Sequence, residues 1–344
     1  MRILITCALL FGAAALSLAN TADPVQQSRV IEFQYEMLAG EFPDHKAVDI
    51  YLPVPAESDS QHTLSQSLRS ALPGKSGIEL KYGNGYYHIH RPANINAPID
   101  ATLRWTVRRD SLTAGQVRDL TAQERERYLA PNALVPVGHA VLDPIRQEVH
   151  AMRVDDSPEA TARAIYDWVV DNVEYKKVGT GWGNGDTFWA CSERYGNCTD
   201  FHALFIALAR SEGIPARFEI GFPIPLDRKQ GQVGGYHCWV QFYLPEQGWI
   251  PIDASEAAKH PDKRELYYGT HPADRIHFST GRDLQLSQGS ARTPLNYFIY
   301  PYVEVGGVPW QVKLQTRFSY REVEAEANAN ANANANANAI GAGS

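Results

Sequence analysis

Alternation of apolar and polar residues in the first third of the chain predicts β-strands. Three segments show a period of two, which is typical of half-buried strands: 30–35, 47–52 and 101–107. Gly83-Asn84-Gly85 is a hairpin-turn signal and precedes another such run, 86–90. We therefore expect residues 28–110 to form a small β-sandwich domain.

Two stretches of this region carry a weaker or more ambiguous pattern. Residues 56–77 are rich in Ser and Gln and are predicted to be a long loop with one helical turn at most. His88 and His90 lie two residues apart and therefore share one face of the predicted strand. The simpler interpretation is a polar strand face, and a ligand role is the alternative.

A helical period replaces this alternation after residue 110. Residues 111–150 mix helix and loop and are interpreted as a helical connector. Ser157 suits an N-cap and Pro158 the first helical position. Apolar residues then recur at helical spacing: Ala164, Ile165, Trp168 and Val169. A helix is therefore predicted from Pro158 onwards.

The strongest amphipathic pattern begins at Cys198. Apolar residues recur on one helical face: Phe201, Leu204, Phe205, Leu208 and Ala209. Gly213 and Pro215 end the pattern, so Cys198 lies in the first turn of a buried helix. The helix dipole and free N–H groups there favour a thiolate. This position suits a nucleophile, and a buried structural cysteine is the alternative.

The segments around this helix are predicted to be a loop and a sheet. The glycine-rich run 179–186 lacks the ending of a phosphate loop and is expected to be a mobile loop. Strands are predicted over 216–222, 236–244, 249–253, 297–305 and 311–320. They belong to a second domain, 151–322, and the Ala-Asn repeat of 323–344 is expected to be a disordered tail.

The hairpin formed by two of these strands supplies two further candidate residues. If its register pairs Tyr243 with Trp249, Asp253 lies one diagonal step from His237 on the same face. Diagonal neighbours are about 7–8 Å apart between backbones, within reach of an imidazole and a carboxylate. Asp253 could then orient His237, and His237 could pair with the thiol of Cys198.

Composition and charge exclude some classes of protein. The chain has 344 residues, 44% of them hydrophobic, and a net charge of −7. No Lys/Arg-rich run is present, which argues against nucleic-acid binding. Residues 1–19 combine Arg2, an apolar run and a small-residue cleavage site, as in a signal peptide. We expect export to the periplasm or the extracellular space, without stable membrane insertion.

The cysteine count bears on the chemistry of the exported protein. Removal of the signal peptide with Cys7 leaves Cys191, Cys198 and Cys238, so one thiol should stay free in an oxidising compartment. If Cys198 is the working thiol, Cys191 and Cys238 can form a disulfide, and strand alternation points Cys238 away from the candidate site. A zinc site of these three cysteines with His202 is the alternative, but its spacing matches no short zinc signature.

Four segments closely resemble the core of the transglutaminase-like superfamily: 195–202, 213–218, 237–243 and 248–253. The similarity covers about residues 150–256 and keeps the family's order of Cys, His and Asp. It implies an α+β, papain-like core in which the cysteine helix packs on an antiparallel sheet. The β-rich region before it resembles the extra domain of bacterial secreted members. On this basis 151–322 is a candidate catalytic domain.

The resemblance also implies an activity. Cys198 would be the nucleophile, His237 the general base and acid, and Asp253 the orienting residue. Family members stabilise the oxyanion with the N–H of the cysteine and a nearby tryptophan, for which Trp182 and Trp189 are candidates. The implied reaction is acyl transfer from protein or peptide amides through an acyl-enzyme, with hydrolysis favoured over amine transfer.

Two further expectations follow from this resemblance. A non-catalytic binding protein of the cell envelope with the same fold is the alternative function. No cofactor or metal is expected, because the sequence lacks an EF-hand-like loop for the calcium on which animal members depend.

Overall fold

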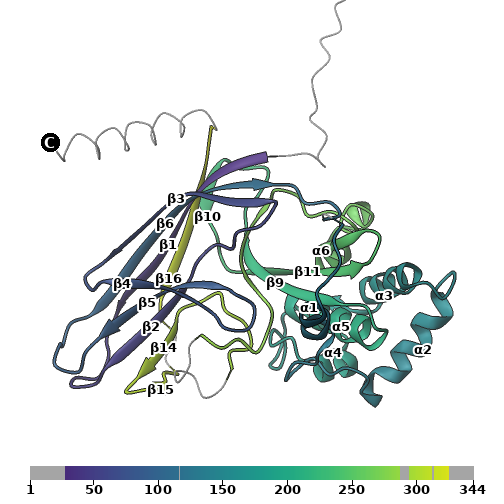
Figure 1. Ribbon diagram of the computed structural model, residues 1–344, viewed down its shortest axis with the longest axis horizontal. Coiled ribbons are helices and arrows are strands. Elements are labelled where there is room, and N and C mark those ends of the chain that lie inside the picture. Colours follow the sequence, from purple (N-terminus) through teal and green to yellow (C-terminus); the bar gives the residue numbers. More distant parts are fainter. Residues whose placement is uncertain (1–27, 116, 287–293, 312–313, 325–344) are drawn as a thin grey trace, which may run out of the picture.

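The computed structural model places a β-sandwich against a second part built of helices and an antiparallel sheet (Figure 1). It describes residues 28–115, 117–286, 294–311 and 314–324. Within those ranges, no helix is long and apolar enough to span a membrane. The predicted signal peptide, 1–19, and most of the predicted tail lie outside the described residues.

Two five-stranded antiparallel sheets make up the sandwich. The first has the order β10-β16-β1-β6-β3, with the bounds Gln230–Gln232, Thr316–Val323, Ser28–Gly40, Ile99–Asp110 and Gln61–Ser70. The second has the order β15-β14-β2-β5-β4, with the bounds Val308–Pro309, Tyr302–Val305, Val48–Pro53, Gly85–Arg91 and Gly74–Ile78.

Alternating side chains of these strands form the core between the two sheets. On β1 the inward residues Ile31, Phe33 and Tyr35 are fully buried, and on β2 Val48 and Ile50 are fully buried as well. The intervening residues point outward, as a period of two requires. The strands predicted from this alternation are therefore confirmed.

The predicted loop over 56–77 is wrong, because most of that stretch forms β3 and β4. β3 lies at an edge of the first sheet and pairs with β6 through backbone hydrogen bonds. Most of its side chains are exposed or half-buried. A strand at a sheet edge needs few apolar residues, and so the Ser- and Gln-rich sequence concealed it.

The predicted domain boundaries are also corrected by the sheet pairings. The strands predicted over 297–305 and 311–320 correspond to β14 and β16; they were assigned to the second domain, 151–322, but they belong to the sandwich. β16 pairs with β1 up to Val323, which pairs with Val30. The predicted tail therefore begins too early at residue 323. Residues 28–110 form only part of the sandwich.

The second part contains a four-stranded antiparallel sheet of order β12-β11-β9-β13, with the bounds Gly248–Ile252, His237–Leu244, Ala216–Pro223 and Arg275–Thr280. Its α-helices are α1 (Ala122–Leu129), α2 (Asp143–Met152), α3 (Pro158–Asn172), α4 (Thr187–Glu193), α5 (Cys198–Ser211) and α6 (Ala254–Lys259). Two short 3₁₀ helices, Ala140–Leu142 and Pro261–Lys263, and a parallel pair, β7 (Glu174–Tyr175) with β8 (Tyr195–Gly196), complete it.

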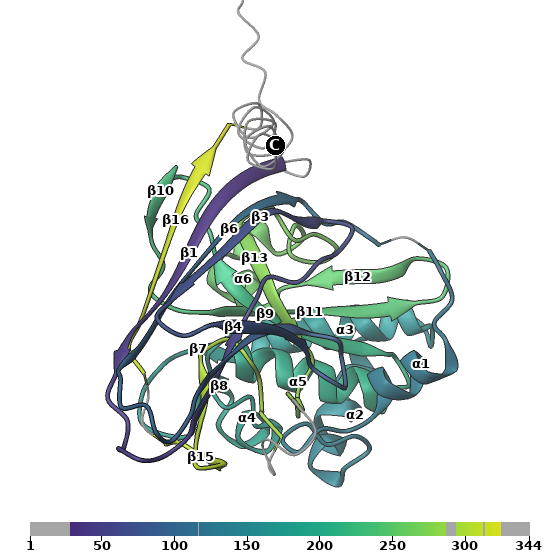
Figure 2. The same cartoon turned by 60° about the vertical axis from the view of Figure 1, so that its left-hand side comes forward.

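Helix α5 is the central element of this part and lies against β11 and β9 of the sheet (Figure 2). Its residues from Cys198 to Arg210 are all buried. The predicted stop is confirmed, because Gly213 follows the helix with φ of 76°, a conformation that glycine adopts without strain. The predicted α+β core, with the cysteine helix packed on an antiparallel sheet, is confirmed.

A shared aromatic cluster joins the sandwich to the sheet. Phe33 of β1 lies 5.1 Å from Phe222 of β9 and 5.7 Å from Phe278 of β13, measured between ring centroids. Phe318 of β16 lies 4.3 Å from Phe222. Because such rings bury large apolar areas, this cluster packs the sandwich firmly against the sheet.

Candidate active site

Cys198 is the first residue of α5, and the turn before it is held by a capping box. The side chain of Asn197 accepts the N–H of Thr199 at 2.8 Å, and Asp200 Oδ2 accepts the N–H of Asn197 at 2.9 Å. Cys198 is 2% exposed. The first N–H groups of a helix have no partner within the helix, so Cys198 presents both its thiol and its N–H at the positive end of the dipole.

His237 and Asp253 meet as the hairpin pattern predicted. The register pairs Tyr243 with Trp249, and His237 Nε2 lies 2.7 Å from Asp253 Oδ2. Asp253 follows β12 and caps α6 by accepting the N–H of Glu256 at 3.0 Å. Because Nε2 faces Asp253, Nδ1 is the ring nitrogen that remains for Cys198, and the imidazole and the thiol are hydrogen-bonded.

The electrostatics of the three groups favour a charged thiol–imidazole pair. Burial lowers the pKa of His237, but the charge and hydrogen bond of Asp253, with a smaller effect of Cys198, outweigh it and raise the pKa to about 10. Burial raises the pKa of Cys198, but hydrogen bonds from Cys238 and His237 and the imidazolium charge hold it well below its ordinary value. The directions of the two shifts therefore favour a Cys198 thiolate beside a His237 imidazolium.

Asp253 is fully buried and binds more partners than His237 alone. Arg275 Nη1 donates to Asp253 Oδ2 at 3.0 Å, and the hydroxyl of Ser255 donates to Oδ1 at 3.0 Å. Burial raises the pKa of Asp253, but His237 and Arg275 outweigh it and hold the pKa well below its ordinary value. Arg275 lies on β13, a strand the sequence pattern did not predict.

Cys238 lies beside the candidate nucleophile, so the prediction that it points away from the site is wrong. Its Sγ is 3.5 Å from Nδ1 of His202 and 3.9 Å from the Thr199 hydroxyl, both on α5. The strand alternates as predicted, but the helix packs on the face that carries Cys238. Burial, and then Cys198, raise the pKa of Cys238 well above its ordinary value. Burial lowers the pKa of His202 to about 4.

These contacts also correct the predicted disulfide. Among the described residues, Cys191, Cys198 and Cys238 all carry free thiols. Cys191 lies on α4, whereas Cys238 packs against the first turns of α5. The alternative zinc set is not gathered either, because the group of ligand atoms within 4.8 Å of one another in the described part of the chain lies elsewhere, on the sandwich.

Neither predicted oxyanion tryptophan has a free indole N–H in this structure. Trp182 Nε1 donates to the carbonyl of Gly179 at 3.1 Å, and Trp189 Nε1 donates to the carbonyl of Tyr195 at 3.1 Å. Both indoles therefore brace the backbone around the site. The N–H of Cys198 at the helix start is the donor that the local geometry favours for an oxyanion.

The glycine-rich run before α4 is anchored to the first turn of α5. Asp200 accepts the N–H of Gly183 at 2.7 Å and that of Gly185 at 3.0 Å, and Arg282 Nη1 donates to the carbonyl of Gly185 at 2.7 Å. Gly196 allows the approach of Asp200, since a Cβ atom there would lie 2.2 Å from Asp200 Oδ2. The loop expected to be mobile thus has fixed hydrogen-bond partners.

Tyr236 is a further neighbour of the site that the sequence pattern did not single out. Its hydroxyl lies 3.0 Å from the Thr199 hydroxyl and accepts from Asn197 Nδ2 at 3.1 Å. Burial, followed by the charge of Cys198, raises its pKa well above the ordinary value. The sequence feature that could have identified Tyr236 is its position one residue before His237. From this position its side chain ties the start of β11 to the first turn of α5.

A large cavity in the described part of the chain is distinct from this cluster. It encloses about 1040 Å³ between the sandwich and the sheet, and its lining includes Arg109, Glu219 and Trp249. None of Cys198, His237 and Asp253 lines it. The candidate active site is therefore identified by its reactive side chains and not by the size of a cavity.

The comparison with protein families agrees with this location. Residues 147–254 match the family model described as the transglutaminase-like superfamily. That range contains Cys198, His237 and Asp253. The chain contains a transglutaminase-like domain.

Two bacterial proteins are similar to parts of this chain. An uncharacterised protein of Haemophilus influenzae is 32% identical over 198 aligned positions, which cover 48% of this chain and 54% of that protein. The uncharacterised protein YebA of Bacillus subtilis is 31% identical over 77 positions, covering 20% of this chain and 10% of YebA. The matched regions thus span about half of the Haemophilus protein and a tenth of YebA.

A solved structure shares the fold beyond the transglutaminase-like domain. A candidate cysteine protease from Cytophaga hutchinsonii superimposes with a TM-score of 0.52 at 18% identity, covering 86% of this chain and 98% of that one. At this identity the likeness is one of fold. Because it covers most of both chains, the sandwich is part of the shared architecture.

The contact between Cys238 and Cys198 predicts a measurable change in thiol reactivity. In Cys238→Ala the hydrogen bond to the Cys198 thiolate is lost, and such bonds to charged groups contribute about 1.5 kcal/mol or more. On the acid limb of the alkylation pH profile, Cys198 should therefore react about tenfold more slowly. Mass spectrometry of the labelled peptide follows Cys198 alone. Cys191→Ala is the matched control and should leave the profile unchanged; equal profiles for all three proteins would contradict the role of Cys238.

Proposed function

We propose that this protein is a thiol acyl-transfer enzyme that acts on protein or peptide amides through Cys198, His237 and Asp253. The contact that carries the proposal is the 2.7 Å hydrogen bond between His237 and Asp253, with the same imidazole bonded to a cysteine at a helix start. A nucleophile, a base and an orienting carboxylate in this order form the arrangement used in covalent acyl transfer.

In the first half of the reaction, the Cys198 thiolate attacks the amide carbonyl carbon. The tetrahedral oxyanion accepts the backbone N–H of Cys198 at the end of the helix dipole. His237 then donates its proton to the departing nitrogen, and the C–N bond breaks with release of ammonia or an amine. The product is a thioester with Cys198, and His237 is left neutral.

In the second half, neutral His237 takes a proton from water while the oxygen attacks the thioester. The C–S bond breaks, the acid leaves and the thiolate–imidazolium pair is restored. Asp253 holds the ring in one orientation throughout and stabilises its charge. A primary amine in place of water would give cross-linking. The Cytophaga fold relative is named as a candidate cysteine protease, which supports hydrolysis as the preferred outcome.

We further propose that the enzyme works outside the cytoplasm. The signal-peptide pattern of residues 1–19 supports this proposal. The three cysteines of the described chain are free, and the proposed reaction requires no disulfide. The thiol of Cys198 must stay reduced for the reaction to occur. A protein or peptide of the cell envelope is the substrate class that suits such a location.

The test is release of products from casein and from a Gln-containing peptide, with and without a labelled primary amine. We expect ammonia or new peptide termini without amine incorporation, and no release by Cys198→Ala. Amine incorporation would instead make the protein a transferase. If no product forms and Cys198 reacts as an ordinary thiol, the enzyme proposal fails in favour of a non-catalytic binding protein.

A further inference from the structure

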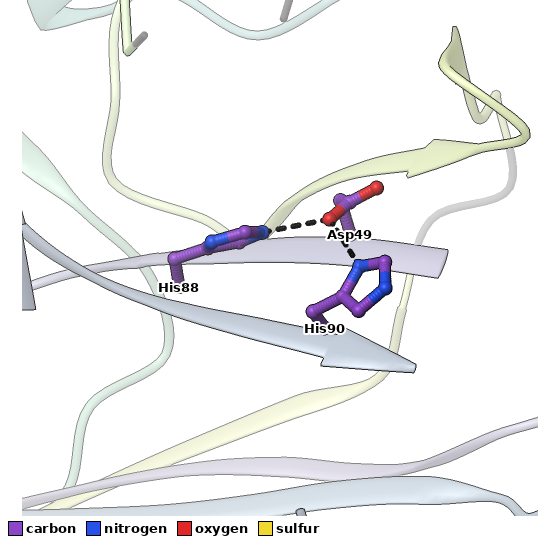
Figure 3. A group of neighbouring side chains, drawn as sticks. All are labelled: Asp49, His88 and His90. Carbon is purple, nitrogen blue, oxygen red and sulfur yellow. Dashed lines mark hydrogen bonds and ion pairs between the residues drawn. The ribbon is translucent and has the colours of Figure 1, made fainter. Parts of the chain in front are cut away.

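The outer face of the second sandwich sheet carries three side chains that converge on one point (Figure 3). Asp49 lies on β2, and His88 and His90 lie on the neighbouring strand β5. Asp49 pairs directly with His90, and His88 is one diagonal step away. The flanking residues Val48 and Ile50 are fully buried in the sandwich core, so the three polar side chains occupy the opposite face.

Both imidazoles approach the same carboxylate oxygen. His88 Nε2 and His90 Nδ1 each lie 2.8 Å from Asp49 Oδ1. One ligand atom from each of the three residues lies within 4.8 Å of the other two. Ligands on a tetrahedral zinc ion, with bonds of about 2.0–2.1 Å, are about 3.3 Å apart. For an ion to enter, each of the two nitrogen–oxygen distances would have to lengthen by about half an ångström.

The surroundings hold the cluster in place and leave it rich in negative charge. The ring of His88 stacks on Tyr51, with centroids 4.6 Å apart and planes 11° from parallel. Glu304 of β14 pairs with Asp49 on its other side. Two adjacent carboxyl groups are stabilised by a nearby cation.

The types of ligand decide which cation fits. Calcium and magnesium prefer sets made of oxygen atoms, whereas two imidazole nitrogens and one carboxylate suit zinc and its neighbours in the first transition row. We propose that Asp49, His88 and His90 form a binding site for a divalent transition-metal ion, with Zn²⁺ as its occupant.

Three protein ligands leave a fourth position for water or for a group of another molecule. His90 is the most exposed of the three, with a side chain 51% accessible, so this position faces solvent. The site lies on the sandwich sheet that contains β2, β5 and β14, whereas Cys198 lies on α5 in the other part of the molecule (Figure 1). Metal binding here is thus independent of the proposed acyl transfer.

Titration of chelator-treated protein with Zn²⁺ tests the site, with Co²⁺ as a spectroscopic probe. The Cys198→Ala protein is used beside the unsubstituted chain, because a thiolate next to an imidazole can also bind zinc. We expect one saturable equivalent of Zn²⁺ in Cys198→Ala, a rise in unfolding temperature with Zn²⁺, and a Co²⁺ spectrum of nitrogen and oxygen ligation without a thiolate band.

Two substitutions remove ligands in different ways. His90→Ala removes the most exposed ligand, and Asp49→Asn keeps the shape of the carboxylate that both histidines share. Each should weaken Zn²⁺ binding by more than the 10–100-fold that loss of a supporting residue causes. Their metal-free unfolding temperatures show that they fold. His62→Ala is the matched control, because His62 of β3 pairs with Glu57 at 3.8 Å and offers no third ligand.

Absence of a saturable equivalent in Cys198→Ala would overturn the proposal. So would equal Zn²⁺ affinity in His90→Ala, Asp49→Asn and His62→Ala. Peptide or amide cleavage by His90→Ala should match the unsubstituted protein. Failure of the metal site would therefore leave the proposed enzyme activity standing, and failure of that activity would leave the metal site standing.

Discussion

Replacement of His237 by alanine should slow alkylation of Cys198 at pH 6 by between about 30-fold and 300-fold. The hydrogen bond and charge of His237 help to hold the pKa of Cys198 well below its ordinary value. An ordinary thiol with a pKa of about 8.5 is ionised to only about one part in 300 at pH 6. The lower bound allows for the greater nucleophilicity of a more basic thiolate.

The shape of the pH profile gives a second readout of the same pair. In the unsubstituted protein the alkylation rate should stay level from about pH 6 to pH 9, because His237 has a pKa of about 10 and keeps its proton. In His237→Ala the rate should rise throughout this range. A small reagent such as iodoacetamide is needed, since Cys198 is only 2% exposed.

His260→Ala is the matched control for this experiment. His260 is an exposed histidine that lies 3.6 Å from Glu256, a residue also close to His237, with no contact to the thiol among the described interactions. It should retain the level profile. A level profile in His237→Ala as well would rule out the thiolate–imidazolium pair and with it the proposed nucleophile.

Replacement of Asp253 by asparagine should reduce turnover by about 10⁴-fold, which is the order of loss when the orienting carboxylate of a triad becomes an amide. The amide can still accept the N–H of Glu256 and cap α6, but it no longer stabilises the charge of His237. The pKa of His237 should therefore fall from about 10, and the level region of the alkylation profile should end at lower pH.

The same substitution should lower the free energy of unfolding by about 3–5 kcal/mol, because it leaves Arg275 and its charge buried without one of its carboxylates. This loss should be largest above about pH 4. A carboxyl whose pKa is depressed in the folded protein stabilises it above the unfolded pKa of about 3.9, and this contribution fades as the pH falls towards the folded pKa. Denaturant unfolding at several pH values measures it.

Asp274→Asn separates the two effects of Asp253. Asp274 also pairs with Arg275, at 2.8 Å, but it has no described contact with His237. Its substitution should cost stability while leaving turnover and the alkylation profile of Cys198 in place. If Asp274→Asn and Asp253→Asn lost turnover equally, Asp253 would act through stability and not through His237.

Several features of the site follow from local sequence signals. The start of α5 at Cys198 is set by Asn197 and Asp200, which cap it, and by the apolar stripe that follows. The hairpin of β11 and β12 has the predicted register because a one-residue slip would turn its apolar residues to the wrong face. These signals suffice to bring His237 close to Asp253.

Other features depend on segments that are distant in the sequence. Arg275 reaches Asp253 only because β13 pairs with β9, and no local pattern specified that pairing. The edge strand β3 is held by backbone hydrogen bonds, which are open to almost any side chain. β14 and β16 were predicted as strands, but the sheet they join was decided by the sandwich core.

By itself, the sequence determined the periodic elements, the cysteine at the helix start and the order of the three candidate residues, since periodicity and capping act within a few residues of the chain. Only the tertiary structure decided which face of β11 meets α5, and so placed Cys238 beside Cys198 and His202. It likewise decided that Trp182 and Trp189 donate to loop carbonyls. The physical reason is that side-chain packing and hydrogen-bond partners depend on segments that come into contact only when the chain folds.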